Sequence, residues 1–269
     1  MEKRRFSLAD FLCKFYVYIL LLLMYAPILL LIVYSFTDTK IIGNWNGFSL
    51  RLYTALFNDS EIMQSFTNTF LVAISSAVVS TVLGTFGAIG IFYCSKRGKA
   101  VLEGISNIPV INAEIVTALS LTILFVFCGV KFNFLTLLIG HVVLTIPFVV
   151  LSVRPKLMQM DANIYEAALD LGATPGRALW SIIIPEIMPG VFSGFILSVT
   201  LSLDDYIITA FTRDTAFQTL STYVYGVTSK KGTLPPSLRA LTTVITLIAL
   251  LILIIVNIKS TKEKENIRK

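Results

Sequence analysis

Three carboxylates stand out because they lie in long stretches of apolar sequence. Glu114 is the one charged residue between positions 105 and 130, and Asp204 and Asp205 are the charged residues between 187 and 211. A carboxylate at the centre of a membrane helix costs about 2.5–3.5 kcal/mol on insertion scales, so its presence needs a reason. Three acids with no Lys or Arg in the same stretches predict a pathway that attracts cations. The alternative is that they pair with a partner subunit or mark a helix end.

Other reactive side chains predict no catalytic site. Cys13, Cys94 and Cys128 are far apart and form no pair typical of a disulfide framework or a zinc site. His141 lies in an apolar run without Cys or carboxylate neighbours, so we expect a packed or hydrogen-bonded histidine rather than a metal ligand. The sequence contains no GxxxxGK[ST] loop for ATP. We therefore expect neither a cofactor nor a metal in this chain.

The composition indicates that the acids lie in a membrane. Hydrophobic residues make up 55% of the 269 positions and charged residues only 14%, whereas an ordinary soluble domain carries about 25% charged residues. Soluble enzymes, disordered chains and nucleic-acid binders are disfavoured on this ground, despite a net charge of +6. A membrane helix needs about 20 apolar residues. The sequence predicts six such spans, at about 15–36, 66–93, 105–130, 132–153, 187–211 and 238–258.

The distribution of basic residues predicts the orientation. Of the 22 Lys and Arg residues, 15 fall on the side that holds both termini, the loop after the second span and the loop after the fourth. The positive-inside rule places this side in the cytoplasm. We expect a cytoplasmic N-terminus (1–14), one six-span domain (15–258) and a basic cytoplasmic tail (259–269). Gly84, Gly87 and Gly90 predict a small-residue stripe for helix packing.

The depth of the acids follows from the expected spans. At 1.5 Å per residue, Glu114 would lie about 14 Å into the third span, near the midplane. Asp204 and Asp205 would lie roughly 26 Å from the cytoplasmic start of the fifth span, toward the external mouth. Successive helical residues point about 100° apart. We therefore expect one aspartate to face the path and the other to meet a helix end or a partner.

The connection of residues 154–186 is too long and too patterned for a simple loop. Residues 164–171 predict a short helix, and Gly172 can end it by taking a positive φ. Thr174 is suited to cap a second helix, with Pro175 at its first position. Two prolines mark the expected transition into the fifth span: Pro185 and Pro189. The result is a helix–turn–helix elbow, and the plain alternative is a helix pair that merely joins two spans.

The elbow resembles the EAA motif of ABC-importer permeases, which reads Glu-Ala-Ala, three residues, Gly, nine residues and Ile-x-Leu-Pro. The matching residues are Glu166, Ala167, Ala168, Gly172, Ile182 and Pro185, while Ile184 replaces the usual Leu. The resemblance implies an all-α type I importer permease whose elbow is a coupling helix that docks on a cytoplasmic ATPase homodimer. Glu166 would bond that partner, the alanines would allow close approach and Gly172 would permit the turn. ATP and Mg would bind the partner, and this chain would be no enzyme.

Three further segments resemble the polyamine-importer permeases, and within them the second of the two permease types. They are Leu-Ser-Leu-Asp-Asp-Tyr at 201–206, Asn-Ala-Glu-Ile-Val at 112–116, and the early Pro27-Ile28 followed by Tyr34-Ser35-Phe36. The resemblance implies spermidine or putrescine as substrate, a second permease of the PotB type, an extracytoplasmic binding protein and a bacterial inner membrane. Spaced carboxylates and aromatic faces suit flexible polycations.

The resulting candidate substrate path contains Asp204, Asp205, Glu114 and Tyr206. Tyr223 and Tyr225 could supply further aromatic faces, although tyrosines at a membrane interface are commonly belt anchors. Related permeases carry iron, thiamine or oxyanions, and these remain alternatives. A stand-alone six-span channel or secondary carrier would also explain the hydropathy and the acids. The spacing of the elbow argues against it, because a channel has no need of that motif.

Overall fold

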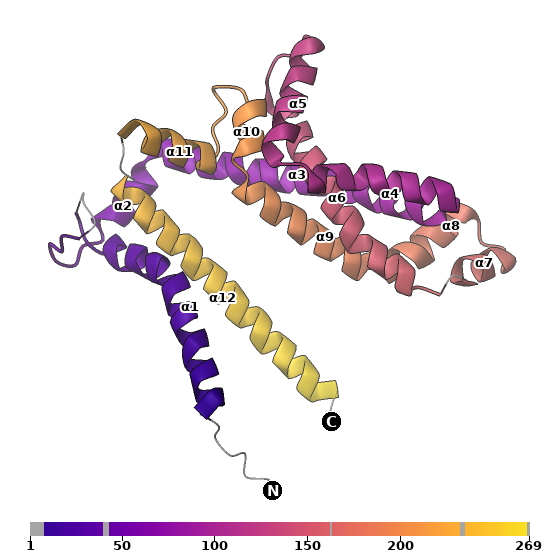
Figure 1. The fold of residues 1–269 in the computed structure, drawn as a ribbon, viewed down its shortest axis with the longest axis horizontal. Coiled ribbons are helices and arrows are strands. Elements are labelled where there is room, and N and C mark those ends of the chain that lie inside the picture. Colours follow the sequence, from indigo (N-terminus) through magenta and orange to yellow (C-terminus); the bar gives the residue numbers. More distant parts are fainter. Residues whose placement is uncertain (1–7, 40–42, 162, 232–234, 268–269) are drawn as a thin grey trace, which may run out of the picture. The chain divides into compact units, whose positions relative to one another are not determined.

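A computed structural model of the chain describes residues 8–39, 43–161, 163–231 and 235–267, and these form helices without any strand among them (Figure 1). The elements are α1 (Leu8–Ser35), α2 (Arg51–Asn58), α3 (Ser60–Tyr93), α4 (Lys96–Ile111), α5 (Glu114–Phe127), α6 (Phe134–Gln159), α7 (Asn163–Asp170), α8 (Pro175–Ala178), the π-helical turn η1 (Leu179–Ile183), α9 (Ile184–Asp204), α10 (Ile207–Thr212), α11 (Leu220–Lys231) and α12 (Pro236–Ile267). The chain divides into two compact units, residues 1–63 with 227–269 and residues 64–226.

The prediction of an all-α membrane protein is confirmed. Four helical segments are long and apolar enough to cross a membrane: residues 15–35 of α1, α3, α6, and the run from α8 through α9. The bent pair α4 and α5 would make a fifth span. In α12 the apolar stretch among the described residues, Pro236–Ile248, is shorter. The count of six spans therefore stays a prediction. Of the two predicted terminal segments, residues 1–7 and 268–269 lie outside the described part.

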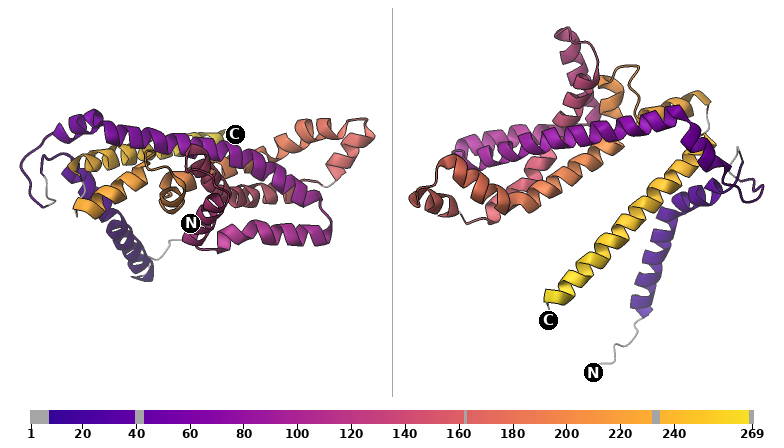
Figure 2. Two further views of the ribbon diagram at one scale, coloured as in Figure 1. Left: turned by 90° about the horizontal axis from the view of Figure 1, so that it is seen from above. Right: turned by 180° about the vertical axis from the view of Figure 1, so that it is seen from behind.

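In the first unit, α12 packs beside both α1 and α2 (Figures 1 and 2). Arg239 is buried at the start of α12, and its Nη1 donates to the carbonyl of Thr39 at 3.0 Å. The hydroxyls of Ser35 and Tyr53 lie 2.8 Å apart and join the end of α1 to α2. The apolar span of α1 is not buried against this chain. It is therefore available to lipid or to another subunit.

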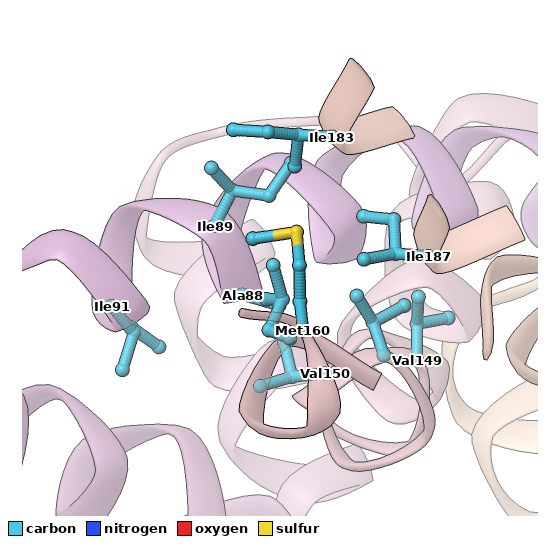
Figure 3. Packing of buried hydrophobic residues seen from close by; sticks show 10 residues of the cluster. Ala88, Ile89, Ile91, Val149, Val150, Met160, Ile183 and Ile187 are labelled. Atoms are coloured by element: carbon cyan, nitrogen blue, oxygen red, sulfur yellow. The ribbon is translucent and has the colours of Figure 1, made fainter. Parts of the chain in front are cut away.

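The second unit is built around α3, α6 and α9, which share one hydrophobic core (Figure 3). Val149 of α6 is fully buried in this core, together with Ala88 of α3 and Ile187 of α9. A Cβ placed on Gly84 of α3 would lie 2.7 Å from the Cβ of Val149, and one on Gly194 of α9 would lie 3.2 Å from its Cα. In lipid the hydrophobic effect does not hold helices together, so small residues that permit close packing matter more.

Buried small residues recur every fourth position on both helices that flank α6. The series are Ser76, Ser80, Gly84 and Ala88 on α3, and Gly190, Gly194, Ser198 and Ser202 on α9. Of the predicted stripe, Gly84 makes a close contact within this chain, whereas Gly87 and Gly90 are exposed, and a contact of these two with another subunit stays a prediction. The reason for their exposure is helical geometry: with 3.6 residues per turn, a spacing of three drifts around the helix faster than a spacing of four.

We expect Gly84→Ala to lower the stability of the chain, because the added methyl overlaps Val149. Overpacking of this kind costs about 1–3 kcal/mol. Gly90→Ala is the matched control, since a Cβ on Gly90 meets no atom within 4 Å. The measurement is the melting temperature of each variant purified in detergent, which should be lower for Gly84→Ala than for Gly90→Ala. Equal melting temperatures would contradict the close contact of α3 and α6.

The third predicted span is not one straight helix. It is broken at Asn112 and Ala113, and α4 and α5 meet at an angle of 104° (Figure 1). Pro109 removes one backbone donor from the last turns of α4, and Asn112 and Ala113 then adopt extended conformations. Glu114 is the first residue of α5, so the continuous third helix is wrong, and the place of Glu114 near the midplane stays a prediction.

The fourth and fifth spans also differ from prediction at the ends that adjoin the elbow. Helix α6 continues through Arg154 to Gln159, and the connection is correspondingly shorter than 154–186. The expected transition into the fifth span lies at Pro185, since α9 begins at Ile184, whereas Pro189 lies inside α9; the helical run from Pro175 to Asp204 is continuous. The π-helical turn η1 ends at Ile183, two residues before Pro185. A local widening of this kind accommodates a proline, which lacks an N–H and crowds the preceding turn.

Candidate functional site

The predicted acids lie at two breaks in the helices of the second unit. Helix α9 ends at Asp204, Asp205 is extended, and α10 begins at Ile207. On the other side, α5 begins with Glu114 directly after the break from α4. Helix α5 packs against α10: Ala118, one turn after Glu114, contacts Ile208, which lies three residues after Asp205. The structure thus brings the start of α5, with Glu114, to the break that holds the two aspartates, about 90 positions later in the sequence. Discontinuous helices commonly form the binding sites of transporters.

The carboxylate of Asp205 is buried and holds the start of α10. Its Oδ1 accepts a hydrogen bond from the backbone N–H of Ile208 at 3.1 Å. Its Oδ2 accepts from the backbone N–H and the hydroxyl of Thr209, at 2.9 and 2.8 Å. This is the role of a helix-capping carboxylate, which satisfies free N–H groups and complements the positive end of the helix. Asp205 therefore meets a helix end, which is the role expected of one of the two aspartates.

Asp204 and Glu114 are exposed, in contrast to Asp205. Asp204 is the last residue of α9, where the final carbonyls give the helix end a partial negative charge. Glu114 lies in the first turn of α5, the end of a helix at which a carboxylate is stabilised. The two carboxylates and the end of α9 together make a region of negative potential. Such a region attracts cations.

Helix α10 is fixed against α5 and α6, and this packing positions the break between α9 and α10. Thr122 of α5 donates its hydroxyl hydrogen to the carbonyl of Phe211 at 3.0 Å. Ile208 is fully buried against Ala118 of α5. A Cβ on Gly140 of α6 would lie 2.7 Å from Cγ2 of Ile208, so only a glycine allows this approach. The break is a packed feature of the unit and not a frayed end.

Aromatic side chains flank the aspartates on one side. The rings of Tyr206 and Tyr225 lie with centroids 4.5 Å apart. Tyr223 is buried instead. Arg213 is held by its own loop, because its Nη1 donates to the carbonyl of Phe217 at 3.0 Å. Tyr206 and Tyr225, rather than Tyr223, are thus the aromatic faces beside the acids.

His141 is hydrogen-bonded, as the sequence predicted. Its Nδ1 lies 2.7 Å from Ser202 Oγ, and its Nε2 lies 2.9 Å from Thr209 Oγ1 and 3.5 Å from Asp205 Oδ2. The sequence reasoning missed its place beside Asp205. These partners are 61 and 68 positions away along the chain, and no local signal connects them.

The predicted elbow has the expected local structure. Helix α7 ends in a turn at Gly172, whose φ is +85°. The N–H of Ala173 bonds to the carbonyl of Ala168 at 3.0 Å, and that of Gly172 bonds to Leu169 at 2.9 Å. This is the Schellman pattern of a glycine-terminated helix. Thr174 then caps α8 through the N–H of Arg177. The turn, the cap and Pro175 at the first helical position are confirmed.

The residues of the EAA pattern divide between two faces of the elbow. Glu166, Ala167, Gly172 and Pro185 are exposed, Ile182 is half-buried in the π-helical turn, and Ala168 is buried. The small size of Ala168 therefore serves packing within this chain. Leu171 is 90% exposed at the tip of the elbow, although nothing in the sequence reasoning singled it out. Leu171 follows Ala167 by one helical turn, and this exposed apolar surface on a short helix is suitable for a protein partner.

The fold and these two regions define a permease of an ABC importer. The chain belongs to the family of binding-protein-dependent transport system inner membrane components, whose model matches residues 80–260. It is therefore a multi-pass membrane transport component and not an enzyme.

Among individual proteins, the chain is 34% identical to the spermidine/putrescine transport system permease protein PotC of Escherichia coli K12, over 82% of this chain and 83% of that one. It is 33% identical to the putrescine transport system permease protein PotI of the same strain, over 82% and 81%.

Solved structures agree on the fold. A bacterial ABC transporter involved in the import of the acidic polysaccharide alginate matches with a TM-score of 0.68 at 17% identity, over 96% of this chain and 99% of that one. An amino acid ABC transporter matches with a TM-score of 0.53 at 18% identity, over 75% and 92%. At these identities the likeness concerns the fold alone.

Proposed function

We propose that this chain is the PotC-type permease subunit of an ATP-driven importer of polyamines. The observation that carries the proposal is the gathering of Glu114, Asp204 and Asp205 at two helix breaks, in a chain similar to PotC and PotI. Spermidine and putrescine are flexible polycations, and removing water from each ammonium group is unfavourable unless carboxylates replace that solvation. Asp204 and Glu114 supply exposed carboxylates, and Tyr206 offers an aromatic face.

The proposal assigns a mechanical role to the elbow. Glu166, Ala167 and Leu171 form an exposed face on a short helix that is fixed at its end by Gly172. In the proposed assembly this face docks on a cytoplasmic ATPase homodimer, which binds ATP and Mg. The elbow continues into α9 without a helix break. Movement of the ATPase would therefore reach Asp204 at the far end of α9 through one helix.

The remaining partners and the orientation follow from the same proposal. A second permease of the PotB type completes the translocation path, and an extracytoplasmic binding protein delivers the substrate. The excess of Lys and Arg on the side of the termini and the elbow supports cytoplasmic ends in a bacterial inner membrane. The unburied apolar surface of α1 is consistent with contact to lipid or to that second permease.

We expect ATP-dependent uptake of labelled spermidine or putrescine by proteoliposomes that contain this chain, its partner permease, the ATPase and the binding protein. Excess unlabelled polyamine should compete, while thiamine, ferric iron and sulfate should not. Omission of the ATPase is the control and should abolish uptake. Competition by one of the other solutes instead would contradict the polyamine assignment. Flux through the chain alone would favour a channel.

A further inference from the structure

A chain of buried polar side chains lies directly behind the break between α9 and α10. Ser76 Oγ of α3 lies 3.1 Å from Ser202 Oγ of α9, which lies 2.7 Å from His141 Nδ1 of α6. His141 Nε2 lies 2.9 Å from Thr209 Oγ1 of α10, which donates to Asp205 Oδ2 at 2.8 Å. All five residues are buried. This hydrogen-bonded network joins four helices at the break between α9 and α10, where the candidate cation site needs a fixed backbone.

The directions of these hydrogen bonds follow from the carboxylate at one end. Because the hydroxyl of Thr209 donates to Asp205, its oxygen is left to accept from His141, and Nε2 must carry the proton. Nδ1 of the neutral ring then accepts from Ser202, whose oxygen accepts from Ser76. Every donor has an acceptor along this route. A buried network that is fully satisfied rigidifies its surroundings.

The network acts on Asp204 through its neighbour. Asp205 holds the start of α10 by three hydrogen bonds, and His141 holds Thr209 and Asp205 from α6. The extended backbone of Asp205 is what ends α9 at Asp204. We propose that His141 is a positioning residue for the cation site, because it fixes the break that leaves Asp204 exposed. This inference rests on the proposed function for its effect on polyamine uptake.

Two conservative variants separate the two nitrogens of His141. The amide nitrogen of Gln can replace Nε2 and donate to Thr209, whereas the amide oxygen of Asn can replace Nδ1 and accept from Ser202. In the complete importer, we expect His141→Asn to raise the KM for spermidine about tenfold, the scale of leaving one buried polar group without its partner. His141→Gln should stay close to wild type. A general loss of packing would instead lower Vmax and the protein level, and it would do so in both the Asn and the Gln variant.

A second pair of variants keeps the inference testable if His141→Asn fails to accumulate. Thr209→Val keeps the shape of the side chain but removes the hydroxyl that links His141 to Asp205, whereas Thr209→Ser keeps it. We expect the KM to rise with Val and not with Ser. Ser80→Ala is a control for the loss of a buried hydroxyl, since the hydroxyl of Ser80 bonds to the carbonyl of Ala77 within its own helix and takes no part in the network around His141. Equal KM values for Val and Ser, or for Gln and Asn, would overturn the inference.

A readout without transport separates this inference from the proposed function. In a chain with Cys13, Cys94 and Cys128 replaced by alanine, Asp204→Cys can be labelled with a water-soluble maleimide in membranes. We expect the labelling rate with His141→Asn to differ several-fold from the rate with His141→Gln. The rate with His141→Gln should match that of the protein that keeps His141. Equal rates would overturn the positioning role. Failure of the wild-type importer to take up spermidine and putrescine would instead overturn the proposed function alone.

Discussion

Gly172→Pro should abolish transport and leave the chain in the membrane at its normal level. The φ of Gly172 is +85°, and a proline ring holds φ near −65°. The turn that ends α7 cannot form, so the face of Glu166 and Leu171 is redirected away from the ATPase. Gly172 lies outside the apolar spans, which is why insertion should be unaffected. Substrate uptake, ATPase co-purification and the amount of chain in isolated membranes are the three measurements.

A matched pair of alanine variants isolates the backbone effect. A Cβ on Gly172 or on Gly176 meets no atom within 4 Å, but only Gly172 of the two has a positive φ. The left-handed conformation costs an alanine about 1–2 kcal/mol. Gly172→Ala should therefore weaken uptake and ATPase binding in part, and Gly176→Ala should leave both unchanged. Normal transport with Gly172→Pro, and normal co-purification, would end the coupling interpretation.

The role of Glu166 in the same contact can be tested separately. Its side chain is exposed in the first turn of α7. Within the described part of the chain it forms no hydrogen bond or ion pair, so its carboxylate is available to a partner. Glu166→Ala should reduce ATPase association and uptake without changing membrane insertion. Asp170→Asn, an exposed acid at the other end of α7, is the control.

The elbow was predictable because its signals are local. A glycine with the right neighbours ends a helix, and a threonine followed by proline starts one, within about a dozen residues. The Schellman turn at Gly172 and the cap at Thr174 follow directly from these preferences. The outward direction of Leu171 and the inward direction of Ala168 were not predictable, because they depend on how the elbow packs on the rest of the unit.

The acids were predictable in kind but not in role. The sequence shows that carboxylates interrupt apolar runs, and it limits one of the two adjacent aspartates to a helix end. It does not show which one. Asp205 became the capping residue because Ile208 and Thr209 turn back toward it, and because His141 lies on α6, 64 positions earlier in the chain. Contacts at such separations leave no periodic signal in one sequence.

The prediction of a straight third span was wrong, because hydropathy was its only guide. An apolar window cannot distinguish a continuous helix from two helices that meet at an angle. At Asn112 and Ala113 the chain bends by 104° while its composition stays apolar. Similarly, the exposed positions of Gly87 and Gly90 depend on where α6 and α9 pack on α3. The features missed from sequence are therefore those that tertiary packing decides.

The same packing gives the two aspartates different expected phenotypes. Asp204→Asn should reduce polyamine uptake by at least about tenfold at normal protein levels, because an exposed charge about 4 Å from an ammonium group is worth a few kcal/mol at an effective dielectric constant of 20. Asp205→Asn should also lower the stability of the chain by about 0.5–2 kcal/mol, the usual effect of a damaged helix cap, and should raise the KM through the position of Asp204. The introduced amide would place N–H groups against the donors of Ile208 or Thr209.

Uptake of labelled spermidine by the complete importer and melting of the purified chain distinguish these outcomes. Glu114→Gln should resemble Asp204→Asn, since Glu114 is also an exposed carboxylate at a helix break. Glu61→Gln removes an exposed charge from the first turn of α3 and is the control, with no expected change. If Asp204→Asn and Glu114→Gln both transport at wild-type rates, the acids are structural. The polyamine assignment would then depend on similarity to PotC and PotI alone.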